Sequence, residues 1–124
     1  MDNQFAHPKV SAQQITLMAI GVMLIALAII LGVYFSPGSN PYIQEVLSLK
    51  GDVTKGHAIF QINCAGCHGW QADGNVGPSL HEVPKRKSKI SLIEQVISGK
   101  TPPMPKFQPS SQEMADLLSY LQQL

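Results

Sequence analysis

The sequence predicts an all-α domain preceded by one membrane-spanning helix. Three observations indicate this fold class. A long charge-free apolar run lies near the N-terminus, two capping boxes precede apolar stripes in the second half, and no stretch alternates polar and apolar residues as a strand would. The 124 residues carry a formal net charge of +1 with only 14% charged residues, so nothing points to nucleic acid as a partner.

The apolar run at 15–35 reads ITLMAIGVMLIALAIILGVYF, without a charge or a proline. As a helix it would be about 31 Å long, which matches the hydrocarbon core of a bilayer. A core helix of a soluble domain would show a polar face, and this run has none. A cleaved secretory signal would end in small side chains, whereas this run ends in Val33-Tyr34-Phe35. These features favour an uncleaved single-pass anchor at 15–35, after a short tail at 1–14, with its surface in membrane lipid.

The anchor is followed by Ser36-Pro37-Gly38-Ser39-Asn40-Pro41, whose prolines and glycine stop a helix. We therefore expect a linker at 36–50, with one short helical turn from Tyr42 to Leu49, and a folded domain at 51–124. This domain is near the lower size limit for a stable core, so a large bound apolar group would add to its stability.

Three helices are expected in the domain. Asp52 is a good N-cap for a helix that runs toward residue 64. Ser91 with Glu94 forms a capping box for a second helix that ends at Gly99. Ser110 with Glu113 forms another, and the helix after it carries an apolar stripe of Met114, Leu117, Leu118 and Leu121.

The chemistry of the chain is concentrated in Cys64-Ala65-Gly66-Cys67-His68, which contains the only two cysteines. C-x-x-C followed directly by histidine is the attachment signal for one covalent c-type haem. Each thiol forms a thioether with a haem vinyl group, and His68 reaches one face of the iron as an axial ligand. A structural zinc site would need a second ligand pair, and a thioredoxin-like redox pair would follow a strand. A structural disulfide would leave His68 unexplained.

The second axial ligand is predicted to be Met104, within Thr101-Pro102-Pro103-Met104-Pro105. Prolines on both sides fix the backbone, and a thioether held in such a loop suits a second axial position, where His/Met ligation raises the haem potential. The alternatives are a methionine that fills a gap in the core, which is the reading preferred for Met114, and His81 as the ligand in place of Met104.

These residues resemble the class I c-type cytochromes, and the resemblance covers 51–124. It is carried by Gly56, Phe60, Cys64, Cys67, His68, Gly77-Pro78, Met104 and Tyr120. It implies that Gly56 and Phe60 meet the terminal helix near Tyr120, and that the carbonyl of Pro78 accepts a hydrogen bond from the His68 ring. The wording GHAIFQINCAGCHG and TPPMPKF is similar to a membrane-anchored cyanobacterial branch of this class. Trp70 is outside the general pattern and is assigned only to packing.

The expected function is that of a membrane-anchored one-electron carrier of a respiratory or photosynthetic chain, in a thylakoid or plasma membrane. Both axial positions are filled, so we expect no enzyme activity and no small-molecule substrate. Its partners would be redox proteins. Because apocytochromes receive their haem on the exported side, the domain should lie on the lumenal or periplasmic face. The alternatives are a haem enzyme or gas sensor with a labile sixth ligand, and a fixed haem subunit of a larger membrane complex.

A basic cluster, Lys85-Arg86-Lys87-Ser88-Lys89, stands out in a chain with so few charges. Clustered charge of one sign steers an oppositely charged partner and speeds association, an effect that salt screens. We hypothesise that the cluster binds an acidic face of the redox partner. An ordinary solvated loop between helices explains the same residues equally well.

Overall fold

The computed structural model describes residues 11–36 and 40–124. Residues 1–10 of the expected tail and 37–39 of the expected linker lie outside the described residues. All regular secondary structure in the described part is helical, in agreement with the predicted all-α class. The chain divides into two compact units, Met1–Ser36 and Pro37–Leu124, which are considered separately below.

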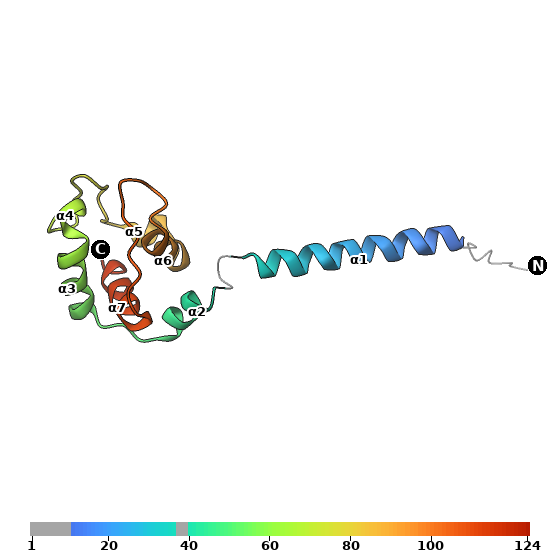
Figure 1. The fold of residues 1–124 in the computed structure, drawn as a ribbon, viewed down its shortest axis with the longest axis horizontal. Coiled ribbons are helices and arrows are strands. Elements are labelled where there is room, and N and C mark those ends of the chain that lie inside the picture. Colours follow the sequence, from blue (N-terminus) through green and yellow to red (C-terminus); the bar gives the residue numbers. More distant parts are fainter. Residues whose placement is uncertain (1–10, 37–39) are drawn as a thin grey trace, which may run out of the picture. The chain divides into compact units, whose positions relative to one another are not determined.

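The first unit is formed by helix α1, which spans Ala12–Tyr34 (Figure 1). Its 23 residues give a length of about 34 Å at about 1.5 Å per residue. A capping box closes its start, because the Gln14 N–H donates to Ser11 Oγ and the Ser11 N–H donates to Gln14 Oε1. None of its residues is buried. By length and composition it is the one helix among the described residues that could cross a membrane.

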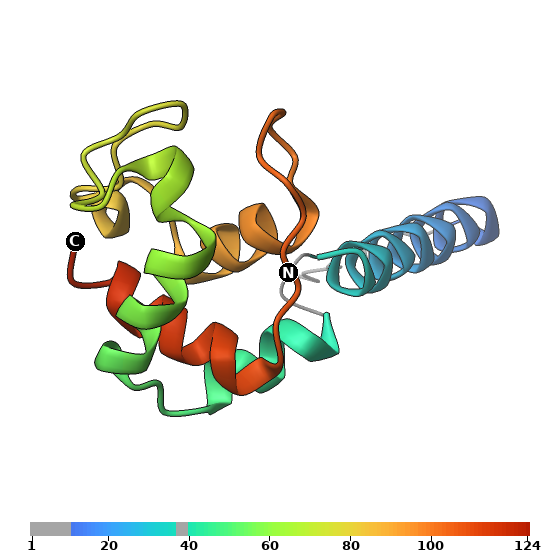
Figure 2. The same ribbon diagram turned by 60° about the vertical axis from the view of Figure 1, so that its left-hand side comes forward.

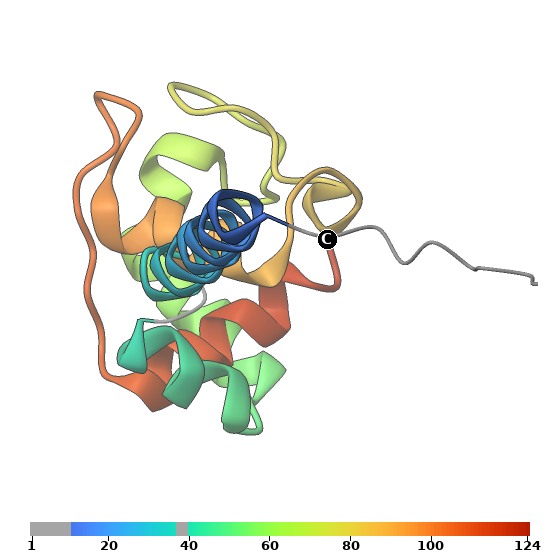
Figure 3. The same ribbon diagram turned by 90° about the vertical axis from the view of Figure 1, so that its right-hand side faces the viewer.

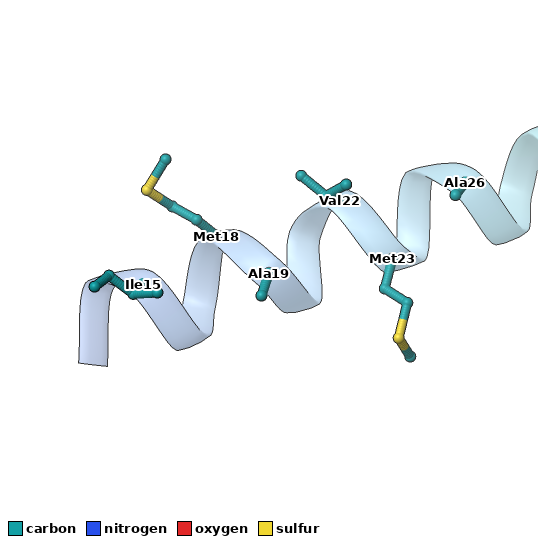
Figure 4. Close-up of a pocket in the computed structure, with 6 residues that line it drawn as sticks. All are labelled: Ile15, Met18, Ala19, Val22, Met23 and Ala26. Atoms are coloured by element: carbon teal, nitrogen blue, oxygen red, sulfur yellow. The ribbon is translucent and has the colours of Figure 1, made fainter. Parts of the chain in front are cut away.

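The surface of α1 includes a shallow apolar pocket (Figure 4). The short side chains of Ala19 and Ala26 lie among larger ones, and the lining consists of Ile15, Met18, Ala19, Val22, Met23 and Ala26. Such a surface favours contact with lipid or another apolar helix over contact with water.

Helix α2, Pro41–Ser48, lies inside the segment expected to be a linker. Asn40 caps it through the Tyr42 N–H at 3.0 Å, and Pro41 occupies its first turn, where a missing N–H costs nothing. Ile43 and Val46 are each only 1% exposed, because α2 packs against the terminal helix. The expected linker at 36–50 is therefore corrected: the folded unit begins before residue 51 and takes α2 into its core.

The core of the second unit is the crossing of α3, Val53–Asn63, with α7, Ser111–Leu121 (Figure 2). Gly56 permits the close approach, since a Cβ at this position would lie 2.0 Å from the Asp116 carbonyl oxygen. Phe60 is fully buried, and its ring centroid is 5.3 Å from that of Tyr120. The resemblance predicted this meeting of α3 with the terminal helix near Tyr120, and the structure confirms it.

One buried carboxylate ties the start of α3 to α7. Asp116 is 3% exposed, and its Oδ1 accepts the Asp52 N–H at 2.8 Å and the Gln112 side-chain amide at 2.9 Å. These bonds satisfy a group that would otherwise be costly to bury. Asp52 in turn caps α3 through the N–H groups of Thr54 and Lys55, as the sequence predicted.

Three shorter helices complete the unit: α4, Ala65–His68; α5, Val83–Arg86; and α6, Lys89–Ser98. The capping box expected at Ser91 is wrong. Ser88 is the N-cap of α6, and its Oγ accepts the Ser91 N–H at 3.2 Å. Ser88 competes successfully because its extended backbone lies one residue before the first helical position.

The end of α6 and the start of α7 agree with the sequence predictions. Gly99 ends α6 in the left-handed conformation, with φ 54°. Ser110 and Glu113 form the capping box of α7. Met114 is 1% exposed on the apolar face of α7, which confirms its assignment to the core.

Candidate functional site

The C-x-x-C-H residues form a single helical turn directly after α3. Cys64 ends α3, and its carbonyl oxygen accepts the N–H groups of Cys67 at 3.1 Å and of His68 at 2.9 Å. Ala65 is buried against the core, whereas Cys64 is half-buried and Cys67 is exposed. Both thiols are free. The turn brings two thiols and one imidazole together within five consecutive residues.

The environment of Cys64 argues against the redox-pair interpretation of this motif. Burial, and secondly the neighbouring Cys67, raise the pKa of the Cys64 thiol to about 11. A dithiol that exchanges electrons through a disulfide needs a lowered thiol pKa, because the thiolate is the attacking species. The zinc interpretation also lacks support: no group of three His, Cys, Asp or Glu side chains suited to a metal ion occurs in 11–36 or 40–124.

The imidazole of His68 is held by the loop that follows it. His68 Nδ1 lies 2.8 Å from the carbonyl oxygen of Pro78. A carbonyl can only accept, so Nδ1 carries the proton and the lone pair is on Nε2. A histidine that binds a metal through Nε2 requires this tautomer. A carbonyl that accepts from Nδ1–H also fixes the orientation of the ligating ring.

Gly77 makes room for the His68 ring. A Cβ at Gly77 would lie 2.7 Å from Cε1 and 2.8 Å from Nδ1 of His68, closer than real Cβ contacts occur. The Gly77 N–H donates to the Cys67 carbonyl at 2.8 Å, and the Gly74 N–H donates to the His68 carbonyl at 2.7 Å. The loop is thus fastened to the motif at three points. The donor set and this glycine cradle fit a haem that the two thiols and the Nε2 of the imidazole would hold.

Met104 lies between α6 and α7, half-buried against the core. Its N–H donates to the Thr101 carbonyl at 3.0 Å, and the Phe107 N–H donates to the Val96 carbonyl at 3.0 Å, which returns the segment to α6. The side-chain amide of Gln95 on α6 donates to Thr101 Oγ1 at 3.4 Å and to the Met104 sulfur at 3.5 Å. Sequence reasoning missed Gln95, which no motif marks.

The loop at 69–80 and the segment at 99–107 extend from the same end of the second unit (Figure 1, Figure 2 and Figure 3). The first carries Pro78 and the second carries Met104. The topology therefore places the candidate residues of both halves of the unit at one end, beyond the α3–α7 crossing.

His81, the alternative to Met104, is engaged elsewhere. Its Nε2 lies 2.9 Å from Asp73 Oδ1, and both side chains are at least half exposed. A ring nitrogen bound to a carboxylate at the surface is a poor candidate for an iron ligand. Trp70 also differs from expectation, since 68% of it is exposed and it does not serve in core packing.

Comparison with known proteins places the chain in a family. A family model described as "Cytochrome C oxidase, cbb3-type, subunit III" matches residues 51–121. The chain is 55% identical over 103 residues to a "Cytochrome c-553-like" protein of Synechocystis, covering 83% of this chain and 96% of the relative. It is 30% identical over 88 residues to "Cytochrome c-551" of Bacillus subtilis, covering 68% of this chain and 78% of the relative.

Among solved structures, cytochrome cL from Hyphomicrobium denitrificans matches with a TM-score of 0.52 and 26% identity. The match covers 71% of this chain and 54% of that structure, so the chain spans about half its length. The helical fold, the single-turn motif and these similarities agree. The chain has the covalently attached haem c of this family as its cofactor. It is a class I c-type cytochrome similar to cyanobacterial cytochrome cM.

Proposed function

We propose that this haem-c electron carrier is a membrane-anchored shuttle whose haem is attached to Cys64 and Cys67 and ligated by His68 and Met104. The observation that carries the proposal is the 2.8 Å contact between His68 Nδ1 and the Pro78 carbonyl. This contact leaves the lone pair of Nε2 available to bind a metal. When bound, the haem supplies an iron that accepts one electron from a reduced protein partner and passes it to an oxidised one. Pro78 fixes the ring plane, and Gln95 orients the Met104 thioether.

The way Met104 is held favours a carrier over an enzyme or gas sensor. A sensor or enzyme needs a sixth position that opens to a small molecule. The Met104 segment is instead fastened to α6 by a backbone bond at Phe107 and by the Gln95 amide. A sulfur that is oriented in advance would lose little entropy on binding an iron, so Met104 would hold the position opposite His68 in both oxidation states.

Replacing Met104 by alanine is expected to remove the ferric sulfur-to-iron charge-transfer band and to lower the midpoint potential, because thioether ligation favours the reduced iron. The variant should bind carbon monoxide when reduced, whereas the unaltered protein should not. Visible spectra of both states, with a potentiometric titration, measure these effects.

The control for Met104 is Met114→Leu, a change of similar volume at a core methionine that should leave the band in place. Loss of the low-spin spectrum in His81→Ala, with the band retained in Met104→Ala, would show that His81 is the ligand. Binding of carbon monoxide by the unaltered reduced protein would favour the enzyme or sensor.

The proposed anchor is α1. Its apolar side chains are exposed around the whole helix, a surface that is stable in lipid and costly in water. The 103 residues matched to the Synechocystis relative exceed the length of 51–124, so that similarity extends before residue 51. Because haem is attached after export, we place the second unit on the lumenal or periplasmic side. The family description as an oxidase subunit keeps open a fixed place in a larger complex, with α1 packed against other helices.

The mature protein is expected to retain α1. Intact mass spectrometry of detergent-extracted protein should include the residues before Ile15, and washing membranes with high salt should not release the haem. Salt does not weaken hydrophobic burial, so only detergent should extract a true anchor. A mature chain that begins near Ser36 would instead show a cleaved signal and a soluble carrier. Haem that migrates with an oxidase complex after mild detergent extraction would favour the fixed subunit.

The proposed acidic docking face of the partner would meet only part of the basic cluster. Lys85 forms an ion pair with Glu82, and Arg86 donates to two backbone carbonyls. Lys87 and Lys89 are exposed. Within the described residues, neither lysine forms an ion pair or donates a side-chain hydrogen bond to a backbone carbonyl. We therefore assign the docking role to these two lysines.

Changing Lys87 and Lys89 to glutamine should slow the second-order electron-transfer rate a few-fold at low salt and flatten its dependence on ionic strength, with the potential unchanged. Stopped-flow kinetics with the redox partner over a range of salt concentrations measure both. Lys50→Gln with Lys55→Gln removes the same charge outside the cluster and serves as the control. Equal effects of the two double variants would reduce the cluster to ordinary solvated surface.

A further inference from the structure

Arg86, the second member of the basic cluster, is exposed, and its guanidinium turns back onto the loop that precedes α5. It lies at the end of the short helix α5, and one nitrogen of its guanidinium, Nη2, serves as the donor in two hydrogen bonds. It donates to the Ser79 carbonyl at 3.0 Å and to the His81 carbonyl at 2.9 Å. Hydrogen bonds from a charged donor are stronger than those between neutral groups.

These two carbonyls belong to the stretch that directly follows Pro78. Leu80 N–H donates to the Ala72 carbonyl at 2.9 Å, and Ser79 Oγ donates to the same carbonyl at 3.3 Å. Ser79 N also faces Gly74, where a Cβ would lie 2.7 Å from it. The stretch is therefore held from one side by the backbone near Ala72 and from the other by Arg86.

The orientation of the Pro78 carbonyl depends on this stretch. The peptide plane between Pro78 and Ser79 carries both the Pro78 carbonyl and the Ser79 N–H, and peptide planes are rigid. Because φ of proline is fixed, the direction of the Pro78 carbonyl depends on ψ of Pro78, the rotation that places the peptide plane shared with Ser79. Holding the Ser79 carbonyl restricts the rotations on either side of Ser79, and hence the plane that contains the Pro78 oxygen.

We propose that Arg86 is a positioning residue for His68: it holds the 78–81 stretch so that the Pro78 carbonyl accepts a hydrogen bond from the His68 Nδ1–H. This proposal rests on the proposed function, in which His68 binds the iron. A strong bond at Nδ1 makes the imidazole a better electron donor and stabilises ferric iron, whereas a weakened bond raises the midpoint potential.

The sign of the potential shift separates positioning from simple electrostatics. Removing a positive charge close to a haem stabilises the ferric state and lowers the potential, and removing one at an exposed site that solvent screens leaves the potential unchanged; neither raises it. Releasing the Pro78 carbonyl raises it. Arg86→Gln is therefore expected to have a higher midpoint potential than Lys87→Gln, which removes the same charge from the adjacent residue. Arg86→Lys keeps the charge but loses the planar fork, and it should shift the potential upward from that of the unaltered protein.

Potentiometric titration of the unaltered protein and the three variants provides the test, together with hydrogen exchange of the His68 ring N–H by NMR. We expect several-fold faster exchange in both Arg86 variants and an unchanged rate in Lys87→Gln. Equal potential shifts in Arg86→Gln and Lys87→Gln, with equal exchange rates, would overturn the positioning role.

The charge-transfer band of the unaltered protein is recorded first, because it reports the axial ligation. Its absence would defeat the proposed function itself. If the band is present while the Arg86 variants leave potential and exchange unaltered, only the present inference fails. Misfolding of either Arg86 variant would appear as loss of the band. A change in positioning alone leaves the band in place.

Discussion

Replacing both Cys64 and Cys67 by alanine is expected to abolish all haem that remains with the chain after denaturing electrophoresis. Axial bonds to histidine and methionine depend on the folded structure and are lost when it unfolds, whereas a thioether survives. The two cysteines are the only ones in the chain, so no other residue can form the bond. Haem-dependent peroxidase staining of the gel, beside a protein stain, measures the loss directly.

The single variants provide the internal control for the attachment. Each retains one thiol in the turn of α4, and we expect reduced but detectable covalent haem in Cys64→Ala and in Cys67→Ala. The half-buried Cys64 anchors the turn to the core more closely than the exposed Cys67 does. Covalent haem that persists at the full level in the double variant would contradict the assignment of the site.

A single methyl group at Gly56 is expected to destabilise the second unit severely. The added Cβ would lie 2.0 Å from the Asp116 carbonyl oxygen, 2.6 Å from its carbonyl carbon and 2.9 Å from Tyr120 Cβ. Two of these atoms are backbone, so α3 must move away from α7 instead of a side chain turning aside. Overpacking of this kind costs about 1–3 kcal/mol, and more where the backbone must move, which is a large part of the stability of a small domain.

Chemical denaturation followed by far-UV circular dichroism measures the change in the free energy of unfolding. Ala58→Ser is the matched control, because it also adds one heavy atom to α3 but at an exposed position. Surface changes of this kind are within about 0.5 kcal/mol. If Gly56→Ala were as stable as Ala58→Ser, the close crossing of α3 and α7 would not be the centre of the fold.

Much of the fold could be predicted because its signals are local. The N-cap Asp52, the capping box of Ser110 with Glu113, and Gly99 each act within one helical turn, and the structure has all three. The apolar stripe after Ser110 determined which face of α7 is buried, and α1 follows from an uninterrupted apolar run. The attachment motif is equally local, since its five residues form one turn.

The errors come from residues whose role depends on a distant partner. The segment at 36–50 has the prolines and glycine of a linker, yet Ile43 and Val46 are buried because α7 offers them an apolar face. Ser91 satisfies the pattern of a capping box, but Ser88 lies where the chain enters α6 and takes the cap. Competition between two adequate local signals is settled by the path of the chain.

By itself, the sequence determined the class of the protein, the two thiols and the imidazole of the motif, and the apolar helix, because short-range spacing is sufficient for each. Only the tertiary structure decided how the site is supported. Gln95 reaches the Met104 sulfur, and the exposed Arg86 donates to the carbonyls of Ser79 and His81 in the loop after Pro78. Neither residue belongs to a motif, since a hydrogen bond between segments depends on where two backbones come to lie. The packing of α6 against α7 sets where the helix that carries Gln95 lies in the unit.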